Sequence, residues 1–267
     1  MASSNISFSK YHGLGNHVVI VDNRQGLHDF SDQQLNRDIC CTKTGVGADC
    51  ILEVINCRHG NHKSCAFQYV THLTTGELGG FCGNGSRCLV EFARKIGVVP
   101  PEGTFSFCGP DGAHWGRHLV EKGLVEISIR DVSEIKKHND QSYSIFTRTL
   151  CHVEFVEDVK EFDLQNFGEK IEADAKLYPT GLDNIMIAKE REGEVTMRSY
   201  ESGVKGETWA CGTGATAVAL VTDFRSNAFN ENCRGFTKAI NARCVSHFKH
   251  LRPARIAQLV ERRLRDQ

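Results

Sequence analysis

Two cysteine-containing segments of the sequence have nearly the same pattern. Residues 82–87 read CGNGSR and residues 211–216 read CGTGAT, so each is a cysteine followed by Gly-x-Gly. The second begins close to half a chain length after the first, which indicates a duplicated architecture with one cysteine, Cys82 or Cys211, in each half. Two cysteines that act on opposite faces of one carbon can remove and replace a proton, which is the chemistry of a racemase or epimerase.

An apolar run without helix breakers follows each motif, at residues 86–95 and 215–221, and predicts a buried helix. The glycines allow a tight turn that brings backbone amides close to a ligand. A helix start also suits a carboxylate, and it lowers the pKa of a cysteine placed there. The alternative is a pair of structural glycine turns with ordinary buried cysteines. The repetition favours the catalytic interpretation.

The composition favours a soluble cytoplasmic protein without a nucleic-acid or membrane partner. The chain has 267 residues, a formal net charge of −1 and a pI near 6.9, so it lacks the excess of positive charge that is typical of proteins that bind nucleic acids or membranes. Residues 1–10 lack the apolar core of a signal peptide, and no apolar run reaches transmembrane length. Twelve cysteines could suggest a secreted disulfide scaffold, but such scaffolds are small, so we expect reduced thiols.

One local cluster tests a metal-site interpretation. Cys57, His59, His62 and Cys65 place four potential ligands within nine residues, which is tighter than the paired spacings of structural zinc sites. Strand-like runs flank the segment, so the sequence favours a hairpin loop over a zinc site.

The order of elements predicts a strand-rich α+β fold rather than an alternating βαβ chain. Helical patterns occupy residues 32–41, 86–96, 164–172 and 215–223. Strand patterns occupy residues 17–22, 50–55, 66–70, 123–129, 152–156, 184–188 and 195–200.

The turn-rich stretch at residues 109–113 suggests a boundary between an N-terminal lobe, residues 1–115, and a C-terminal lobe, residues 116–223. Residues 224–267 form an atypical tail with little strand pattern. Within the tail, Ile256, Leu259, Val260 and Leu264 share one face of a predicted basic amphipathic helix.

Four blocks, spread over roughly residues 7–221, resemble the diaminopimelate epimerase family. They are residues 8–16 (FSKYHGLGN), 45–49 (GVGAD), 81–88 (FCGNGSRC) and 200–215 (YESGVKGETWACGTGA), and they occur in the order that the family has. The two cysteine blocks together are highly specific.

This resemblance implies two pseudo-symmetric lobes, each a β-sheet wrapped around a central helix, with the active site in the inter-lobe cleft. It implies that Cys82 and Cys211 form a thiolate–thiol pair that inverts the α-carbon of an amino-acid substrate, without a metal or an organic cofactor. The amides of Gly83, Asn84, Gly212 and Thr213 would stabilise the carbanion on the substrate carboxylate. A homodimer is compatible with the family.

Other correspondences are looser. Asn16 and Asn184 match amides that contact the substrate, Glu201 matches a carboxylate that binds its ammonium group, and His152 matches a supporting histidine. The chain also departs from the family at several positions, and two of the family residues that are lost, the asparagine at Leu73 and the arginine at Ser202, help to hold the distal carboxylate of diaminopimelate. Residues 73–76 (LTTG) replace Asn-Ala-Asp-Gly, Leu150 replaces an asparagine, Ser202 replaces an arginine, and Cys50 replaces a frequent glutamine.

Four functions follow from these observations. The first is epimerisation of LL- to meso-diaminopimelate, and the second is cofactor-independent racemisation of another amino acid. The third is a catalytically silent relative that binds an amino acid or a protein, which the altered tail suggests and the two cysteines oppose. A proline-racemase-like member of the fold is disfavoured, because its motifs surround the cysteines differently.

Overall fold

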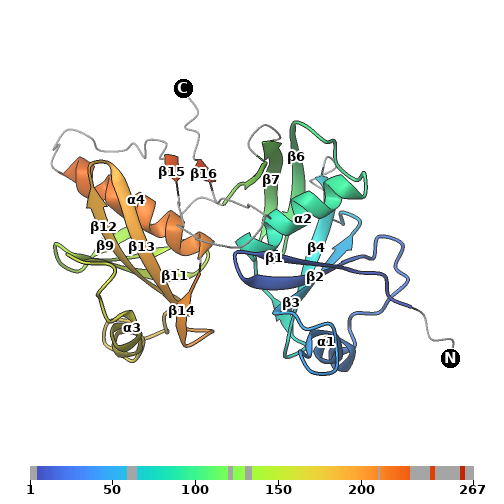
Figure 1. Cartoon of the computed structure of the whole chain (residues 1–267), viewed down its shortest axis with the longest axis horizontal. Coiled ribbons are helices and arrows are strands. Elements are labelled where there is room, and N and C mark those ends of the chain that lie inside the picture. The colour runs from blue at the N-terminus through green and yellow to red at the C-terminus, as the bar shows by residue number, and fades with distance from the viewer. Residues whose placement is uncertain are drawn as a thin grey trace. The chain divides into compact units, whose positions relative to one another are not determined.

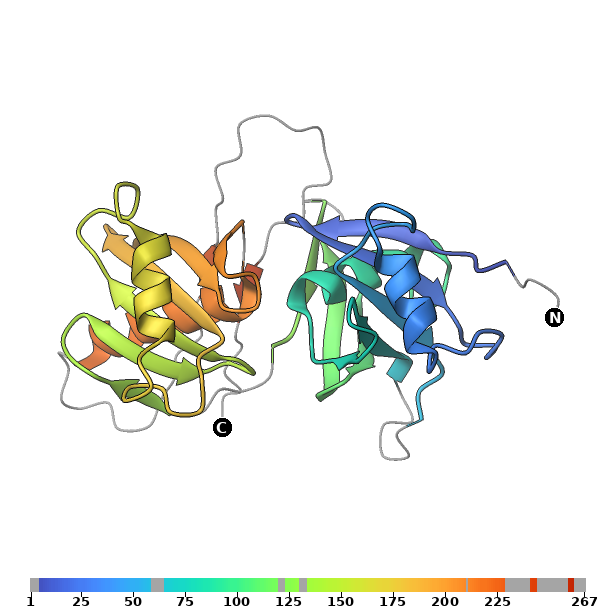
Figure 2. The same ribbon diagram turned by 90° about the horizontal axis from the view of Figure 1, so that it is seen from below.

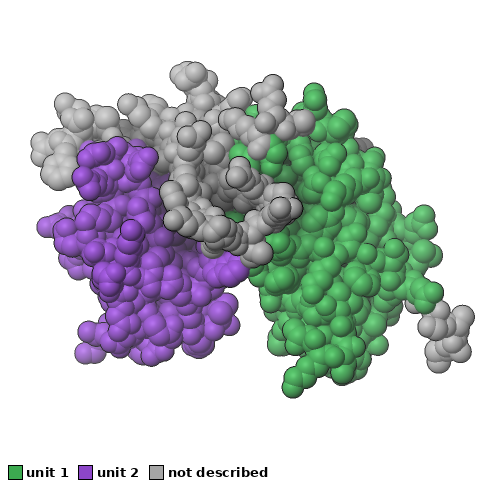
Figure 3. Space-filling model, in the orientation of Figure 1, with its two compact units in different colours: residues 1–128, 252–257 green, residues 129–251, 258–267 purple. Residues whose placement is uncertain are grey.

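The structure of the chain is a computed structural model that describes residues 5–58, 65–119, 123–129, 134–209, 211–228, 241–243 and 259–261. It divides into two compact units, with the division between Ser128 and Ile129 (Figure 3). The sequence placed the boundary between residues 115 and 116. The division falls later because strand β7 (Gly112–Leu119) runs through that point and pairs with β8 (Leu124–Ile127) in the first sheet.

The first unit consists of a mixed sheet and two helices. Its other elements are β1 (Ser9–Gly13), β2 (Asn16–Asp22), α1 (Gln33–Cys40), β3 (Cys50–Ile55), β4 (Cys65–Leu73), β5 (Leu78–Gly79), α2 (Gly83–Lys95) and β6 (Thr104–Gly109). Among the described residues the strand order is β1-β2-β3-β4-β6-β7-β8, with β5 paired to β4 (Figure 1). Successive side chains of β2 point to opposite faces, so Val18 and Ile20 pack with α2 while Val19 and Val21 pack with α1.

The second unit repeats this arrangement of a sheet between two helices. Its elements are β9 (Ile135–Lys137), β10 (Ser142–Phe146), β11 (Leu150–Phe155), α3 (Leu164–Glu172), β12 (Asn184–Arg191), β13 (Glu194–Glu201), β14 (Gly206–Thr208) and α4 (Gly212–Ala228). The strand order is β14-β13-β12-β11-β10-β9. Met186 and Ala188 of β12 pack with α4, whereas Ile185 and Ile187 pack with α3, which lies against the sheet in Figure 2.

The two units share one chain path. In each, an antiparallel strand pair leads into a parallel pair, β2 with β3 or β11 with β12, and a short helix connects the parallel strands. Two further antiparallel pairings then lead to the long helix, α2 or α4. The predicted α+β fold, with a sheet against a central helix in each half, is therefore confirmed. The predicted inter-lobe cleft stays a prediction.

The boundaries of the motif helices differ from those predicted. Helix α2 begins at Gly83 rather than residue 86, and α4 spans Gly212–Ala228 rather than residues 215–223. The reason is that each motif cysteine directly precedes its helix, so the Gly-x-Gly residues form the first helical turn. No helix in the described part of the chain is long and apolar enough to cross a membrane.

The amphipathic helix predicted for the tail is wrong at Leu259 and Val260. They lie in strand β16 (Leu259–Glu261), which pairs with β15 (Asn241–Arg243) in a separate two-stranded sheet. A short apolar run suits a strand as well as a helix, so its periodicity could not distinguish them. Ile256 and Leu264 lie outside the described residues.

Candidate functional site

Cys82 caps the N-terminus of α2. Its backbone is extended, its carbonyl accepts from the N–H of Ser86 at 2.8 Å, and its Sγ accepts from the N–H of Gly85 at 3.3 Å. The half-buried thiol donates to the side-chain oxygen of Asn16, at 3.3 Å. The sulfur therefore lies at the positive end of the helix, where a thiolate is stabilised.

Asn16 is held in place by a carboxylate. Its Nδ2 donates to Oδ2 of Asp49 at 2.9 Å, and the same oxygen accepts from the backbone N–H of His17 at 2.6 Å. This fixes the amide oxygen of Asn16 toward Cys82. The substrate-binding asparagine expected from the resemblance thus contacts the thiol, and Asp49, the last residue of the second resemblance block, is a supporting residue that sequence reasoning missed.

Cys211 begins α4 in the same way. Its carbonyl accepts from the N–H of Ala215 at 2.9 Å, and its Sγ accepts from the N–H of Gly214 at 3.3 Å. The hydroxyl of Thr213 lies 3.4 Å from the sulfur. Only 7% of Cys211 is exposed, so this thiol is more deeply buried than Cys82.

A Cβ at the last glycine of each Gly-x-Gly would displace the end of a buried side chain. A Cβ on Gly85 would lie 2.7 Å from Cδ1 of Leu52, and a Cβ on Gly214 would lie 2.4 Å from the thioether of Met186. By contrast, a Cβ on Gly83 would meet only Phe81, at 3.7 Å, which is an ordinary contact. Gly85 and Gly214 thus leave room for the side chains of Leu52 and Met186, and neither glycine has an unusual backbone conformation.

The electrostatics of Cys211 differ from the sequence prediction. Burial raises the pKa of its thiol, the negative charge of Glu201 raises it further, and hydrogen bonds from Thr213 and Gly214 oppose the shift without cancelling it. The prediction of a lowered cysteine pKa is wrong here, because desolvation outweighs the helix terminus. In this environment Cys211 holds its proton.

Glu201 lies beside Cys211. Burial raises the pKa of its carboxyl, and hydrogen bonds from Thr208 and Cys211 partly offset this effect. The hydroxyl of Thr208 donates to Oε1 of Glu201 at 2.6 Å. The structure thus places Glu201 next to the thiol, where its carboxylate disfavours a neighbouring thiolate.

Asn184 and Thr213 meet in a polar network at the start of α4. Nδ2 of Asn184 donates to the hydroxyl of Thr149 at 2.8 Å, and that hydroxyl donates to Oγ1 of Thr213 at 3.0 Å. The hydroxyl of Thr147 donates to the carbonyl of Thr213 at 3.1 Å. Thr147 and Thr149 were not identified from the sequence, and no motif in it distinguishes them.

His152 does not join this network. It follows Cys151 on β11, and Cys151 packs in the same cluster as Cys211. Because neighbouring side chains of a strand point to opposite faces, the ring of His152 lies on the α3 face, where Nδ1 is 2.6 Å from the hydroxyl of Tyr178. His152, which was predicted to support the catalytic pair, therefore lies in the core on the α3 face and not on the face of the Cys211 thiol.

Asn84 belongs to a second buried group at the start of α2. Its Oδ1 accepts from Nη2 of Arg87 at 2.6 Å, and Nη1 of Arg87 donates to the carbonyl of Gly83 at 3.3 Å. Only 2% of Arg87 is exposed. The guanidinium adds a positive charge to this helix start, and its burial could not be read from the sequence.

Three of the residues that depart from the family pattern, at positions 50, 150 and 202, are packed or have a buried polar atom. Leu150 contacts the cluster under α3, and its N–H donates to Asp183 at 2.7 Å. Cys50 is buried in the α2 core, where burial and then the charge of Cys82 raise the pKa of its thiol. The hydroxyl of Ser202 is also buried.

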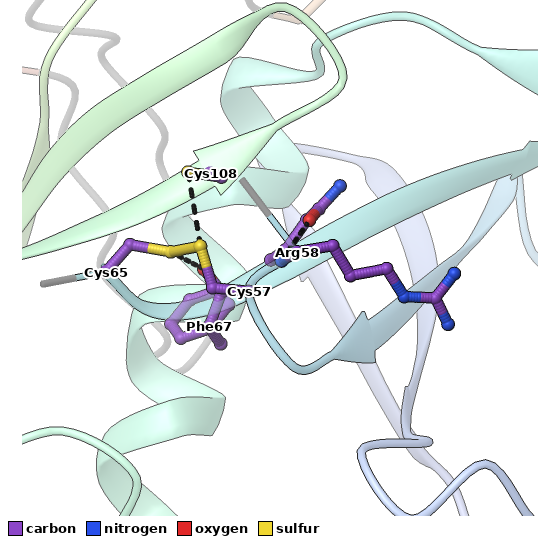
Figure 4. Close-up of a disulfide and its surroundings, with 6 residues drawn as sticks. Cys57, Arg58, Cys65, Phe67 and Cys108 are labelled. Atoms are coloured by element: carbon purple, nitrogen blue, oxygen red, sulfur yellow. Dashed lines mark hydrogen bonds between the residues drawn. A yellow bond between two sulfur atoms is a disulfide. The ribbon is translucent and has the colours of Figure 1, made fainter. Parts of the chain in front are cut away.

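The expectation that all thiols are reduced is wrong at one pair, since Cys57 and Cys65 form a disulfide (Figure 4). The strands β3 and β4 bring the two residues together at one end of a hairpin. The other two residues of the cluster considered as a metal site, His59 and His62, lie outside the described residues.

A comparison with protein-family models gives no match. Among curated proteins, the diaminopimelate epimerase of Flavobacterium psychrophilum is 32% identical over 212 residues, which is 79% of each chain. That of Aquifex aeolicus is 31% identical over 229 residues, or 81% of each chain. Each similarity thus extends over about four fifths of the chain rather than over a single local block.

Solved structures agree at the level of the fold. A probable proline racemase from Agrobacterium radiobacter has a TM-score of 0.59 at 12% identity and covers 90% of this chain and 81% of its own. A hydroxyproline epimerase from Agrobacterium vitis has a TM-score of 0.55 at 11% identity and covers 88% and 79%. Such low identities show the fold alone. It is the sequence relatives that show that this chain belongs to the diaminopimelate epimerase family and is an isomerase, an amino-acid epimerase.

Proposed function

We propose that this protein interconverts LL- and meso-diaminopimelate, a precursor of lysine and peptidoglycan, by two-base proton transfer at the α-carbon. The observation that carries the proposal is the paired geometry of Cys82 and Cys211. Each cysteine caps a helix and accepts the N–H of the glycine three residues later, at 3.3 Å. A cytoplasmic location, predicted from the composition, and a homodimer both remain predictions.

In the proposed reaction one cysteine, as thiolate, removes the α-proton, and the other, as thiol, delivers a proton to the opposite side of the carbon. The raised pKa of Cys211 supports its role as the thiol of the resting pair. Negative charge develops on the substrate carboxylate, and the first-turn amides of residues 83–84 and 212–213 would stabilise it. These steps use only side chains and backbone amides of this chain.

Two supporting roles follow from the site. Asn16 would position the Cys82 thiol through its side-chain oxygen. Glu201 would bind the substrate ammonium, whose positive charge would offset the burial of that carboxyl. Asn184, held by Thr149 beside Thr213, would contact the substrate from the second unit.

A second candidate is racemisation of a different amino acid. Ser202 cannot supply the paired charged hydrogen bonds that an arginine gives to a distal carboxylate, and each such bond contributes about 1.5–3 kcal/mol. Leu73 and Leu150 likewise offer no polar group at the positions of the family's amides. These replacements favour a substrate without a second carboxylate.

Proton NMR in D2O would separate the two candidates. Reduced protein is incubated with LL-diaminopimelate and, separately, with a panel of L-amino acids, and the loss of each α-proton signal and the formation of the inverted isomer are followed. Inversion of diaminopimelate supports the first candidate, and inversion confined to a panel member supports the second. The variant Cys41→Ser, a half-buried cysteine outside both motifs, should behave as the unmodified protein. Absence of exchange from every substrate, in protein whose circular dichroism shows it to be folded, would contradict both.

A further inference from the structure

Three cysteine sulfurs gather at one end of the first sheet. Cys57 follows β3, Cys65 begins β4 and Cys108 lies in β6, and their sulfur atoms all lie within 4.8 Å of one another (Figure 4). Cys57 and Cys65 are joined as a disulfide, and the Cys108 sulfur lies 3.8 Å from that of Cys57. Neither the cysteine motifs nor the proposed reaction uses any of the three.

The pairing of the strands holds this cluster in place. Gln68 of β4 is the antiparallel partner of Ile55 near the end of β3, and it is also the parallel partner of Cys108 in β6. Cys65 and Cys108 thus lie in neighbouring strands, and Cys57 lies two residues after the end of β3, the strand on the other side of β4. The order of the strands in the sheet therefore brings together residues that are far apart in the sequence.

The separation of the Cys57 and Cys108 sulfurs suits a tetrahedral thiolate site. Two ligands of an ion with Zn–S distances of about 2.3 Å lie about 3.8 Å apart, which is the separation of Cys57 and Cys108. Cys108 is fully buried, whereas Cys57 and Cys65 are half-buried, so an ion could enter from the side of these two. Thiolates are soft ligands that select zinc over magnesium or calcium.

We propose that, once the disulfide is reduced, Cys57, Cys65 and Cys108 bind one zinc ion, with water or an external ligand in the fourth position. A cellular dithiol supplies two electrons and two protons, which break the S–S bond into two thiols, and the dithiol itself becomes a disulfide. Zinc then displaces the protons of the three thiols to solvent. Disulfide and metal are alternative states of the same site.

Cobalt titration of the full chain tests this directly. Protein is reduced, freed of metal with a chelator, and titrated with Co²⁺ as a spectroscopic probe, followed by competition with Zn²⁺. We expect one equivalent bound, with thiolate-to-cobalt charge transfer in the near-ultraviolet and the intense visible bands of tetrahedral Co²⁺. Unreduced protein should show neither the charge-transfer band nor the visible bands. Absence of these bands from reduced protein, or equal bands in unreduced protein, would overturn the proposal.

Variants assign the ligands. Cys108→Ala and Cys65→Ser should each weaken Zn²⁺ binding by more than the roughly 10–100-fold that follows loss of an outer-shell partner. Cys41→Ser is the matched control and should bind as the unmodified protein does. The double variant Cys82→Ser/Cys211→Ser should also bind fully, so failure of this site and failure of the proposed reaction are distinguishable. Unchanged affinity in both folded ligand variants, or equal loss in Cys41→Ser, would refute a three-cysteine site.

Discussion

The two units place a cysteine at a helix start in the same way but surround its sulfur differently. The half-buried thiol of Cys82 faces the amide oxygen of Asn16, which Asp49 holds in place. The buried thiol of Cys211 faces the carboxylate of Glu201 and the hydroxyl of Thr213. The capping geometry is common to both, whereas burial and charge are particular to each. The comparison teaches that one motif can hold two thiols in different surroundings, and in the second unit burial and the charge of Glu201 raise the pKa of the Cys211 thiol.

The units also differ in how their sheets are completed. After α2, the strands β6, β7 and β8 extend the first sheet, and β7 and β8 contact α2. After α4, the described strands β15 and β16 form a separate two-stranded sheet. The part that repeats is therefore the chain up to and including the cysteine-capped helix, which is the part that positions the chemistry.

The largest expected effect comes from removing either thiol. Cys82→Ser and Cys211→Ser should each lower kcat by about 10²–10⁴-fold, the usual contribution of one general acid or base. Steady-state epimerisation assays measure the kcat of both variants. If one variant kept full activity, the two units would not be equivalent partners in proton transfer.

The next effect concerns the glycines that allow close packing. Gly85→Ala and Gly214→Ala should each destabilise the protein by about 1–3 kcal/mol, the typical result of overpacking a core. Urea unfolding measures the change, and Gly83→Ala is the matched control, since its Cβ meets only an ordinary contact.

A second substitution sharpens this test in the second unit. Met186→Ala removes the thioether that a Cβ on Gly214 would strike, so the double variant should lose less stability than the sum of the two single variants. If the losses of stability in the two single variants simply added up in the double variant, the contact with Met186 would not be the cause of the destabilisation by Gly214→Ala.

A smaller effect is expected from Asn16. Asn16→Ala removes one hydrogen bond to the Cys82 thiol, worth about 1 kcal/mol, and should lower kcat about fivefold. The exposed Asn56, which donates to the carbonyl of Arg24, gives the control Asn56→Ala. A fall in kcat with both variants would point to a general loss of structure instead.

The smallest effect is electrostatic and belongs to the second unit alone. The Glu201 carboxylate raises the pKa of Cys211, so Glu201→Gln should lower that pKa and move thiol alkylation to lower pH. The difference should vanish at a pH low enough to protonate Glu201, whose own pKa burial raises. The measurement uses a Cys41→Ser/Cys82→Ser background, because a hydrogen bond with Thr44 lowers the pKa of Cys41 and because Cys82 is a less buried thiol than Cys211, so both would compete for the reagent. If the pH profile of alkylation were the same in both proteins, Glu201 would not be the cause of the raised pKa of Cys211.

Much of the local structure could be predicted from the sequence, and most of what failed depends on tertiary contacts. The Gly-x-Gly motifs and their apolar runs identified both long helices, and the continuous apolar run at residues 185–188 identified β12. Strand alternation separates Cys151 from His152, but the sequence does not show which face α4 covers. Burial, which decides the pKa of Cys211, likewise appears only when the chain is folded.

The sulfur cluster illustrates the same limit. The sequence placed Cys57 and Cys65 near each other along the chain, but Cys108 joins them only through the parallel pairing of β4 with β6. Strands β6 and β7 were not predicted, because glycine, serine and histidine interrupt their apolar pattern. The pairing of β4 with the unrecognised strand β6 could therefore not be anticipated.

The central claim is that two different thiols serve the two faces of one carbon. Its most direct test is the isotope content of substrate and product early in the reaction in D2O, measured by NMR or mass spectrometry. If two bases act, the product should carry deuterium at the α-carbon from the first turnovers while the remaining substrate keeps its proton. Product that retains the original proton would instead mean that a single base removes and returns it, which would contradict the account.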